Sequence, residues 1–197
     1  MEIYIIRHGR TVWNEKKLLQ GSRDIELNEE GREVAKQLGE TLKDIKIDRI
    51  YSSPLKRAYE TAQLISGGRE IEIVTDNRLR ELNFGENEGK SVLEIREDET
   101  NPFRYFFSQP ELYFAPKDGE TLEALCKRAR EFMEDMIEPH KDEMERVMIV
   151  AHGALNKALL CHAKQHGIEE FWSGGLQKNC SATILKLDDE GYHVIEN

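Results

Sequence analysis

Two histidines in this chain each stand at the end of a short apolar run and directly before a glycine. His8 lies in the stretch IIRHG at 5–9, and His152 lies in IVAHG at 149–153. A single histidine at the end of a buried strand is ordinary. Two in the same context, one of them beside an arginine, favour a shared functional site.

Two arginines add anion-binding capacity to these histidines. Arg7 adjoins His8, and Arg57 lies in the expected first turn of a helix that follows SSP at 52–54. Planar guanidinium groups bind phosphoryl oxygens bidentately, and backbone N–H groups at the start of a helix favour an anion. A neutral imidazole beside them can attack phosphorus. Arg7, His8, Arg57 and His152 therefore predict a phosphate site with a histidine nucleophile.

Short apolar and β-branched runs predict the strands that must carry these side chains. They occupy residues 2–6, 48–51, 71–74 and 147–151, with two final strands at 182–187 and 192–195. Because strands alternate with helical segments, we expect an α/β fold, a three-layer α/β/α sandwich around a mainly parallel sheet. The carboxyl ends of parallel strands meet at one edge, so His8 and His152 should face one cleft.

Capping signals and helical spacing predict the helices between the strands. Asn28 should cap a helix, and Ser53 should cap another with Pro54 at its first position. Two more helices are expected from 120 to near 139 and from 154 to about 165. The core-facing side of the first helix should carry Val34, Leu38, Leu42 and Ile45.

The 197 residues are expected to form a single domain with an insertion at about 78–118. This insertion is less regular than the rest and should form a helical and loop cap over the active site. We expect about half of the aromatic residues at 101–116 to pack the insertion onto the sheet and one or two to face the pocket. The aromatic residues are Phe103, Tyr105, Phe106, Phe107, Tyr113 and Phe114.

Composition limits the class of partner. Hydrophobic residues make up 39% and charged residues 34%, which is typical of a folded globular protein, and the formal net charge is -10. That charge disfavours nucleic acid and anionic membranes as partners. No apolar run approaches the roughly 20 residues of a membrane-spanning helix, so a cytoplasmic location is expected. A small phosphorylated metabolite is the expected partner, and a homodimer is left open.

The cysteines and the remaining histidines suggest no metal site. The three cysteines are odd in number and form no Cys-x-x-Cys pair, so they predict small buried hydrophobic residues. A surface or packing role is the expectation for the four remaining histidines, because no acidic ligand is placed convincingly with them. These seven residues are Cys126, Cys161 and Cys180, with His140, His162, His166 and His193.

The stretch RHGRTVWN at 7–14 resembles the signature of the histidine phosphatase superfamily, in the branch that contains cofactor-dependent phosphoglycerate mutase. The resemblance covers nearly the whole chain. The insertion and the residues at 171–172 most resemble broad-specificity, cofactor-independent phosphatases of that branch. Further matching blocks follow in order at 20–21, 27–31, 52–58, 61–62, 80–81, 84–85, 88–89, 119–121 and 151–153.

This resemblance implies a mechanism and assigns roles. His8 would attack phosphorus to give a phosphohistidine, while Arg7, Arg57 and His152 stabilise the equatorial oxygens in the transition state. Glu81 would protonate the leaving oxygen and then, as a carboxylate, activate the hydrolytic water. Without the resemblance, Glu81 is one acidic residue among many in its region. No metal ion and no organic cofactor is implied.

The resemblance also assigns four residues to the phosphate pocket and reveals two departures. Asn14 and Gln20 would line the pocket as neutral donors, and Gly9 and Gly153 would let the backbone approach the ligand closely. The two departures are Arg10, where the family usually has Glu or Gln, and Asn87, where it commonly has Trp.

Three functions are compatible with these residues. The first is hydrolysis of small phosphate monoesters, the second is phosphoglycerate mutase-type phosphoryl transfer, and the third is a catalytically inactive phospho-ligand binding module. A mutase should place basic groups over its pocket, whereas the segment at 101–116 is rich in Phe and Tyr with Arg104 as its only basic residue. Hydrolysis is therefore the preferred interpretation.

Overall fold

A six-stranded sheet runs through the centre of the protein, which a computed structural model describes over residues 1–195. The strand order is β3-β2-β4-β1-β5-β6. The first four of these are mutually parallel, and the last two join antiparallel, which confirms the mainly parallel sheet. The strands are β1 (Glu2–Arg7), β2 (Arg49–Ser52), β3 (Ile73–Thr75), β4 (Arg146–Ala151), β5 (Ala182–Asp188) and β6 (Gly191–Ile195).

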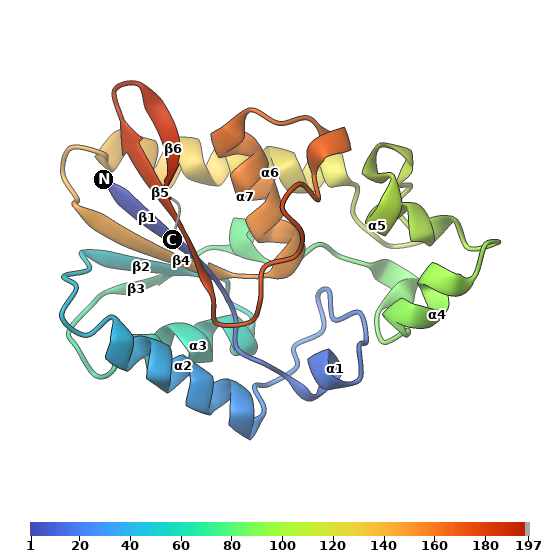
Figure 1. Cartoon of the computed structure of the whole chain (residues 1–197), viewed down its shortest axis with the longest axis horizontal. Helices are drawn as coiled ribbons and strands as arrows, with labels where there is room; N and C mark the ends of the chain where they lie inside the picture. Colours follow the sequence, from blue (N-terminus) through green and yellow to red (C-terminus); the bar gives the residue numbers. More distant parts are fainter. Residues whose placement is uncertain (196–197) are drawn as a thin grey trace.

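Four long helices cover the two faces of the sheet (Figure 1). Alternate residues of β1 point to opposite faces, so Ile3 and Ile5 pack with α6 and α7 while Tyr4 and Ile6 pack in a second cluster with α3. The three layers follow from this alternation. These helices are α2 (Glu29–Thr41), α3 (Lys56–Ser66), α6 (Leu122–Met136) and α7 (Gly153–Lys164).

The expected insertion extends from one end of this sandwich, where α4 and α5 lie together (Figure 1). An aromatic cluster holds it together: the Phe103 and Phe106 rings are 5.5 Å apart, and both contact Tyr113. The short helices are α1 (Val12–Glu15), α4 (Val92–Glu97) and α5 (Tyr105–Ser108), with 3₁₀ turns at Asn77–Leu79, Gly85–Asn87, Pro102–Arg104, Pro110–Leu112, Glu138–His140 and Ile168–Glu170.

The start of α3 differs from the expectation. The predicted cap, Ser53, lies outside the helix, which begins at Lys56 after an extended Leu55. The Ser53 hydroxyl accepts the Leu55 N–H at 3.3 Å, a local hydrogen bond that favours a turn over a helix. By contrast, Asn28 caps α2 as predicted and accepts the Gly31 N–H at 2.8 Å.

The buried face of α2 also differs from the expectation. Val34 is 37% exposed, although it was predicted to face the core. Leu42 is buried and Leu38 and Ile45 pack against the core as predicted, and the small residues Gly31, Ala35 and Gly39 complete the buried face. A Cβ at Gly39 would lie 2.9 Å from the backbone oxygen of Ile65, so the glycine lets α2 and α3 pack closely.

Other expectations need smaller corrections. The strand predicted at 71–74 begins at Ile73, because the Ile71 N–H closes a turn onto the Arg69 carbonyl at 2.8 Å. Cys161 and Cys180 are buried as predicted, whereas Cys126 is half-buried on α6. Within residues 1–195, none of the helices has the length and apolar character to cross a membrane.

Candidate active site

The carboxyl ends of β1, β2 and β4 meet at one edge of the sheet. Arg7 lies opposite Ala151 in the β1–β4 pair, so the histidines that follow these strands are neighbours. The ring centroids of His8 and His152 are 5.2 Å apart. A cavity of about 700 Å³ opens at this edge. The two histidines are neighbours as predicted, but only His8 is among the residues that line this cavity, while His152 is fully buried.

The His8 ring is neutral and presents one free nitrogen. Its Nδ1 lies 2.6 Å from the Gly9 carbonyl oxygen, which can only accept, so Nδ1 carries the proton and Nε2 keeps its lone pair. Burial, followed by the positive charges of Arg57 and Arg7, holds the pKa of His8 well below its ordinary value of 6.5. This imidazole can act as a nucleophile without a base to deprotonate it.

His152 lies beside His8 at the start of α7 and is fully buried. Its Nε2 is 2.8 Å from the Ser53 hydroxyl. That hydroxyl accepts the Leu55 N–H and can donate its own proton to Nε2, the arrangement in which the ring proton of His152 lies on Nδ1. Burial and the charge of Arg57 lower the pKa of His152 well below its ordinary value.

Backbone carbonyls hold the two arginines in fixed orientations. Arg57 is fully buried, and its terminal nitrogens donate to Arg23 O at 2.6 Å and Gly21 O at 2.8 Å. Arg7 donates from Nη1 to Gln177 O at 2.6 Å. Burial lowers the pKa of Arg57 to about 10 and also lowers that of Arg7, so both stay charged at neutral pH.

Unpartnered buried atoms converge on this site. In residues 1–195, five buried side-chain polar atoms have no hydrogen-bond partner: Arg7 Nε, Arg57 Nε, His152 Nδ1, Gln20 Oε1 and Asn156 Oδ1. Leaving one such group unsatisfied costs about 1–3 kcal/mol. Four of the five belong to the residues predicted to bind phosphate. An anion with several acceptor oxygens would satisfy the two arginine donors and the His152 donor together.

Glu81 lines the same cavity from a different part of the chain. Its carboxylate accepts the N–H groups of Ala154 and Leu155 at 3.1 and 3.0 Å, at the start of α7, and that of Leu82 at 2.9 Å. The positive end of the helix thus holds an acidic side chain at the cavity that His8 also lines. The resemblance singled out Glu81, whereas its local sequence could not.

Three of the four predicted pocket residues line the cavity: Asn14, Gln20 and Gly153. A Cβ at Gly153 would lie 3.6 Å from Glu81 Oε2 and 2.9 Å from the Leu176 side chain, so the glycine leaves these groups room. Asn14 also uses its Oδ1 in the capping box of α1.

Gly9 has a different structural reason to be glycine. A Cβ at this position would lie 2.8 Å from the carbonyl oxygen of Gly31, which makes the glycine necessary for the close approach of α2. Its predicted contact with the ligand stays a prediction.

The start of α3 was expected to offer its backbone N–H groups to an anion. The Lys56 N–H instead donates to the Asp24 carboxylate at 2.7 Å.

Sequence reasoning missed two amide residues, Gln177 and Asn179, that hold Arg7 and His8. Gln177 donates from Nε2 to the carbonyls of Ile5 and Ser181, each at 2.8 Å. These bonds hold Gln177 in place, and its own backbone carbonyl accepts the hydrogen bond from Arg7. Asn179 donates to His8 O at 2.8 Å. Both residues lie about 170 positions from His8, and no local pattern marks them.

The outer part of the cavity combines apolar and basic side chains. Phe106 and Phe107 line it, which confirms that one or two aromatic residues of the insertion face the pocket. Arg96 also lines it and stacks over Phe107 at 4.5 Å. The segment at 101–116 contributes only aromatic residues to this lining, as expected, and the basic residues Arg10, Lys17 and Arg96 come from other parts of the chain.

The four remaining histidines lie away from this cavity, and each of them has a carboxylate nearby, at 3.9 Å in the case of His166 and Glu170. His162 Nε2 lies 2.9 Å from Glu138, and His140 and His193 have similar acidic neighbours. In the part of the chain that the structure describes, no group of three or more His, Cys, Asp and Glu side chains is placed to hold a metal ion.

Comparisons with known proteins agree with this geometry. The family described as "Histidine phosphatase superfamily (branch 1)" matches residues 3–196. Putative phosphoserine phosphatase 2 of Hydrogenobacter thermophilus is 37% identical over 95% of this chain and 90% of its own. The 2,3-bisphosphoglycerate-dependent phosphoglycerate mutase of Cytophaga hutchinsonii is 32% identical over 86% of this chain and 80% of its own. The structure of Bacillus stearothermophilus YhfR superposes with a TM-score of 0.89 at 38% identity, covering 98% of this chain and 94% of that one.

Proposed function

Because this chain belongs to branch 1 of the histidine phosphatase superfamily and is a phosphomonoesterase, we propose that it hydrolyses small phosphate monoesters through a phosphohistidine on His8. One observation carries the proposal. Three buried side-chain nitrogens without partners within residues 1–195, on Arg7, Arg57 and His152, belong to the same site as an imidazole that keeps a free lone pair. A tetrahedral anion fits this arrangement of donors and nucleophile.

The first half-reaction transfers the phosphoryl group to the enzyme. His8 Nε2 attacks phosphorus while the bond to the leaving oxygen breaks on the opposite side. Arg7, Arg57 and His152 donate to the equatorial oxygens, whose negative charge these fixed donors stabilise in the transition state. A protonated Glu81 gives its proton to the leaving oxygen, so the products are an alcohol, a phosphohistidine and a carboxylate.

The second half-reaction releases phosphate. The Glu81 carboxylate takes a proton from a water molecule as the water oxygen attacks phosphorus. The bond from phosphorus to His8 Nε2 breaks, and the ring returns to its neutral form. Glu81 ends protonated, as it began, so one carboxyl group serves both steps and the proton balance closes.

We also propose that the insertion at about 78–118 acts as a cap that selects the leaving group. Phe106, Phe107 and Trp172 form an apolar wall of the cavity, and each buried square ångström of a leaving group on such a wall contributes roughly 25 cal/mol. Arg96 and Lys17 add positive charge at the same cavity. A small phosphorylated metabolite with apolar or anionic groups fits these surroundings.

Phosphoglycerate mutase-type transfer is the second candidate. The basic residues Arg10, Lys17 and Arg96 on the cavity favour it, as does the similarity to the Cytophaga hutchinsonii mutase. An inactive phospho-ligand binding module is disfavoured, because the nucleophile, the acid and both arginines are all present. The cytoplasmic location and a homodimer stay predictions.

The decisive experiment measures two activities of the purified protein in a chelating buffer. We expect phosphate release from an aryl phosphate without added metal, together with a higher kcat/KM for that ester than for isomerisation of 3-phosphoglycerate in the presence of 2,3-bisphosphoglycerate. Efficient isomerisation with little phosphate release would replace the hydrolase by the mutase. Absence of both activities, with phosphate still bound, would favour the binding module.

A further inference from the structure

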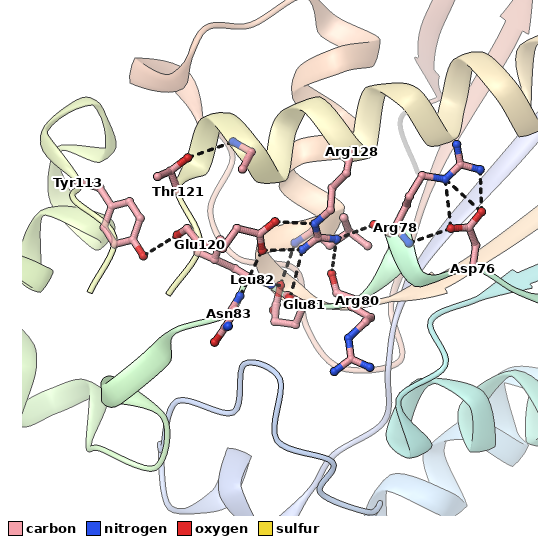
Figure 2. Close-up of polar contacts among 12 residues, drawn as sticks. Asp76, Arg78, Arg80, Glu81, Leu82, Asn83, Tyr113, Glu120, Thr121 and Arg128 are labelled. Atoms are coloured by element: carbon pink, nitrogen blue, oxygen red, sulfur yellow. Dashed lines mark hydrogen bonds and ion pairs between the residues drawn. The ribbon is translucent and has the colours of Figure 1, made fainter. Parts of the chain in front are cut away.

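Glu81 lies in a stretch of chain without regular secondary structure. Residues 80–84 run between the 3₁₀ turns Asn77–Leu79 and Gly85–Asn87, so no helix or sheet ladder fixes the backbone that carries this carboxyl group. A proton donor must nevertheless be held close to its productive position. Figure 2 shows what lies against this stretch: the guanidinium of Arg128, which projects from α6.

Arg128 uses its guanidinium nitrogens in five hydrogen bonds (Figure 2). Nη1 donates to Arg78 O at 2.5 Å and to Arg80 O at 2.6 Å. Nη2 donates to Glu81 O at 3.2 Å. Nε and Nη2 also bind the two carboxylate oxygens of Glu120, at 2.7 and 2.9 Å. One rigid side chain therefore fixes three carbonyls in and just before the stretch that carries Glu81.

Glu120 contacts the same stretch at Asn83, through both its backbone and its carboxylate. Its backbone N–H donates to Asn83 O at 2.8 Å, and its carboxylate accepts the Asn83 N–H at 3.3 Å. The Tyr113 hydroxyl donates to Glu120 O at 3.1 Å. The side chains of Arg128 and Glu120 are only 18% and 19% exposed, so this bidentate pair is shielded from water.

We propose that Arg128, together with Glu120, is a positioning residue for Glu81; this inference rests on the proposed function. The Glu81 backbone is held from α6 by Arg128, and its carboxylate is held from the start of α7 by Ala154 and Leu155. The backbone and the side chain of Glu81 are thus both held, which keeps the carboxyl group at the cavity that it lines. Lysine at position 128 could not reproduce the planar fork of five donors.

The test compares two classes of ester in variants of the full chain. For Arg128→Met we expect kcat with an alkyl phosphate to fall about 10- to 100-fold, the loss expected when a catalytic group is displaced by about 1 Å. The fall with an aryl phosphate should be several-fold smaller, because a phenolate leaves with less need of a proton. KM should change little, because Arg7, Arg57 and His152 still bind the phosphate.

A double substitution shows whether Arg128 acts through Glu81. In the Glu81→Gln background, Arg128→Met should reduce kcat by no more than about 3-fold further, since coupled residues are not additive. Arg130→Met is the matched control: Arg130 lies on the same helix, 53% exposed, and pairs with Glu134. We expect it to retain wild-type kcat for both esters. Arg128→Lys gives a second measurement if Arg128→Met does not fold.

Hydrogen exchange separates failure of this inference from failure of the proposed function. Arg128→Lys should speed exchange of the Leu82 N–H, which donates to the Glu81 carboxylate, more than Arg130→Met does. An inactive wild-type protein would overturn the proposed function and leave this readout intact. Equal losses with both esters, full additivity with Glu81→Gln, or unchanged Leu82 exchange would each overturn the positioning role.

Discussion

The two guanidiniums that would bind the phosphate also help to keep His8, the proposed nucleophile, neutral. Arg57 and Arg7 disfavour a third positive charge on the buried His8 ring, so its pKa lies well below 6.5. The Gly9 carbonyl selects the tautomer with the proton on Nδ1. A proton on Nε2 would abolish nucleophilicity at the atom that faces the substrate, so charge and tautomer are controlled by separate neighbours.

We predict that His8→Ala abolishes both turnover and the acid-labile phosphoenzyme, because no other group in the cavity combines a free lone pair with flanking guanidiniums. Phosphate release from an aryl ester and trapping of labelled phosphoenzyme provide the two measurements. Residual activity within about tenfold of wild type corresponds to only about 1.4 kcal/mol of barrier. That outcome would show that His8 is not the nucleophile.

We predict that Glu81→Gln slows alkyl phosphates more than aryl phosphates. Glutamine keeps the size of the side chain but cannot deliver a proton to the leaving oxygen, and an alkoxide depends on that proton more than a phenolate does. The measurement is kcat for a matched alkyl and aryl pair in wild type and variant. An equal loss with both esters would mean that Glu81 is not the leaving-group acid.

At the scale of elements, the insertion brings chemistry to the cavity that the sheet does not supply. Arg96 from α4 stacks on Phe107 from α5, so a basic group is held at the aromatic wall. Phe103 is buried within the insertion, whereas Phe107 is half-buried and reaches the cavity. The same element thus contains aromatic residues that stabilise it and others that a leaving group can contact.

We predict that Phe107→Ala lowers kcat/KM for an aryl phosphate about 2- to 12-fold, the range that corresponds to the about 0.5–1.5 kcal/mol of an aromatic pair. A small alkyl phosphate should lose less, because it does not reach the ring. The control is Phe114→Ala, whose side chain belongs to the same insertion but is 80% exposed. Equal effects of the two substitutions would place the leaving group elsewhere.

At the scale of the whole molecule, the surface and the cavity differ in charge. The chain carries a net charge of -10, yet the cavity is lined by Arg7, Arg10, Lys17, Arg57 and Arg96, with Glu81 as the one acidic side chain among its lining residues within 1–195. Screening acts over about 8 Å at physiological salt, so a bound anion responds mainly to these nearby cations.

We predict that stability falls as pH drops below about 6.5, in the range where unfolded histidines protonate. His8 and His152 stay neutral in the fold because their pKa values are lowered, so the unfolded chain binds more protons and the free energy of unfolding rises with pH. Each contributes up to about 1.4 kcal/mol per pH unit. Urea unfolding at pH 7.5, 6.0 and 5.0 measures this slope.

His8→Gln serves as the control for this pH dependence, because it removes one titrating group without adding a charge. The slope between pH 6.0 and 5.0 should decrease by up to about 1.4 kcal/mol per pH unit in this variant. A variant with the wild-type slope would show that His8 protonates equally in the folded and unfolded chain.

The sequence by itself determined the α/β class, the strands that end at His8 and His152, and the anion-binding character of Arg7 and Arg57. These properties depend on local signals: runs of β-branched residues, capping side chains and residue types at strand ends. Parallel pairing then brings strand ends to one edge whatever the details of packing. The resemblance to a family was needed to choose Glu81 from its many acidic neighbours.

Only the tertiary structure decided what surrounds these groups. The exposure of Val34, the start of α3 and the basic residues that line the cavity depend on how distant segments pack. The hydrogen bonds from Asn179 to His8 and from Arg128 to the Glu81 carbonyl join residues 171 and 47 positions apart. Such contacts leave no periodic or local trace in a single sequence, because they arise when the fold brings separate elements together.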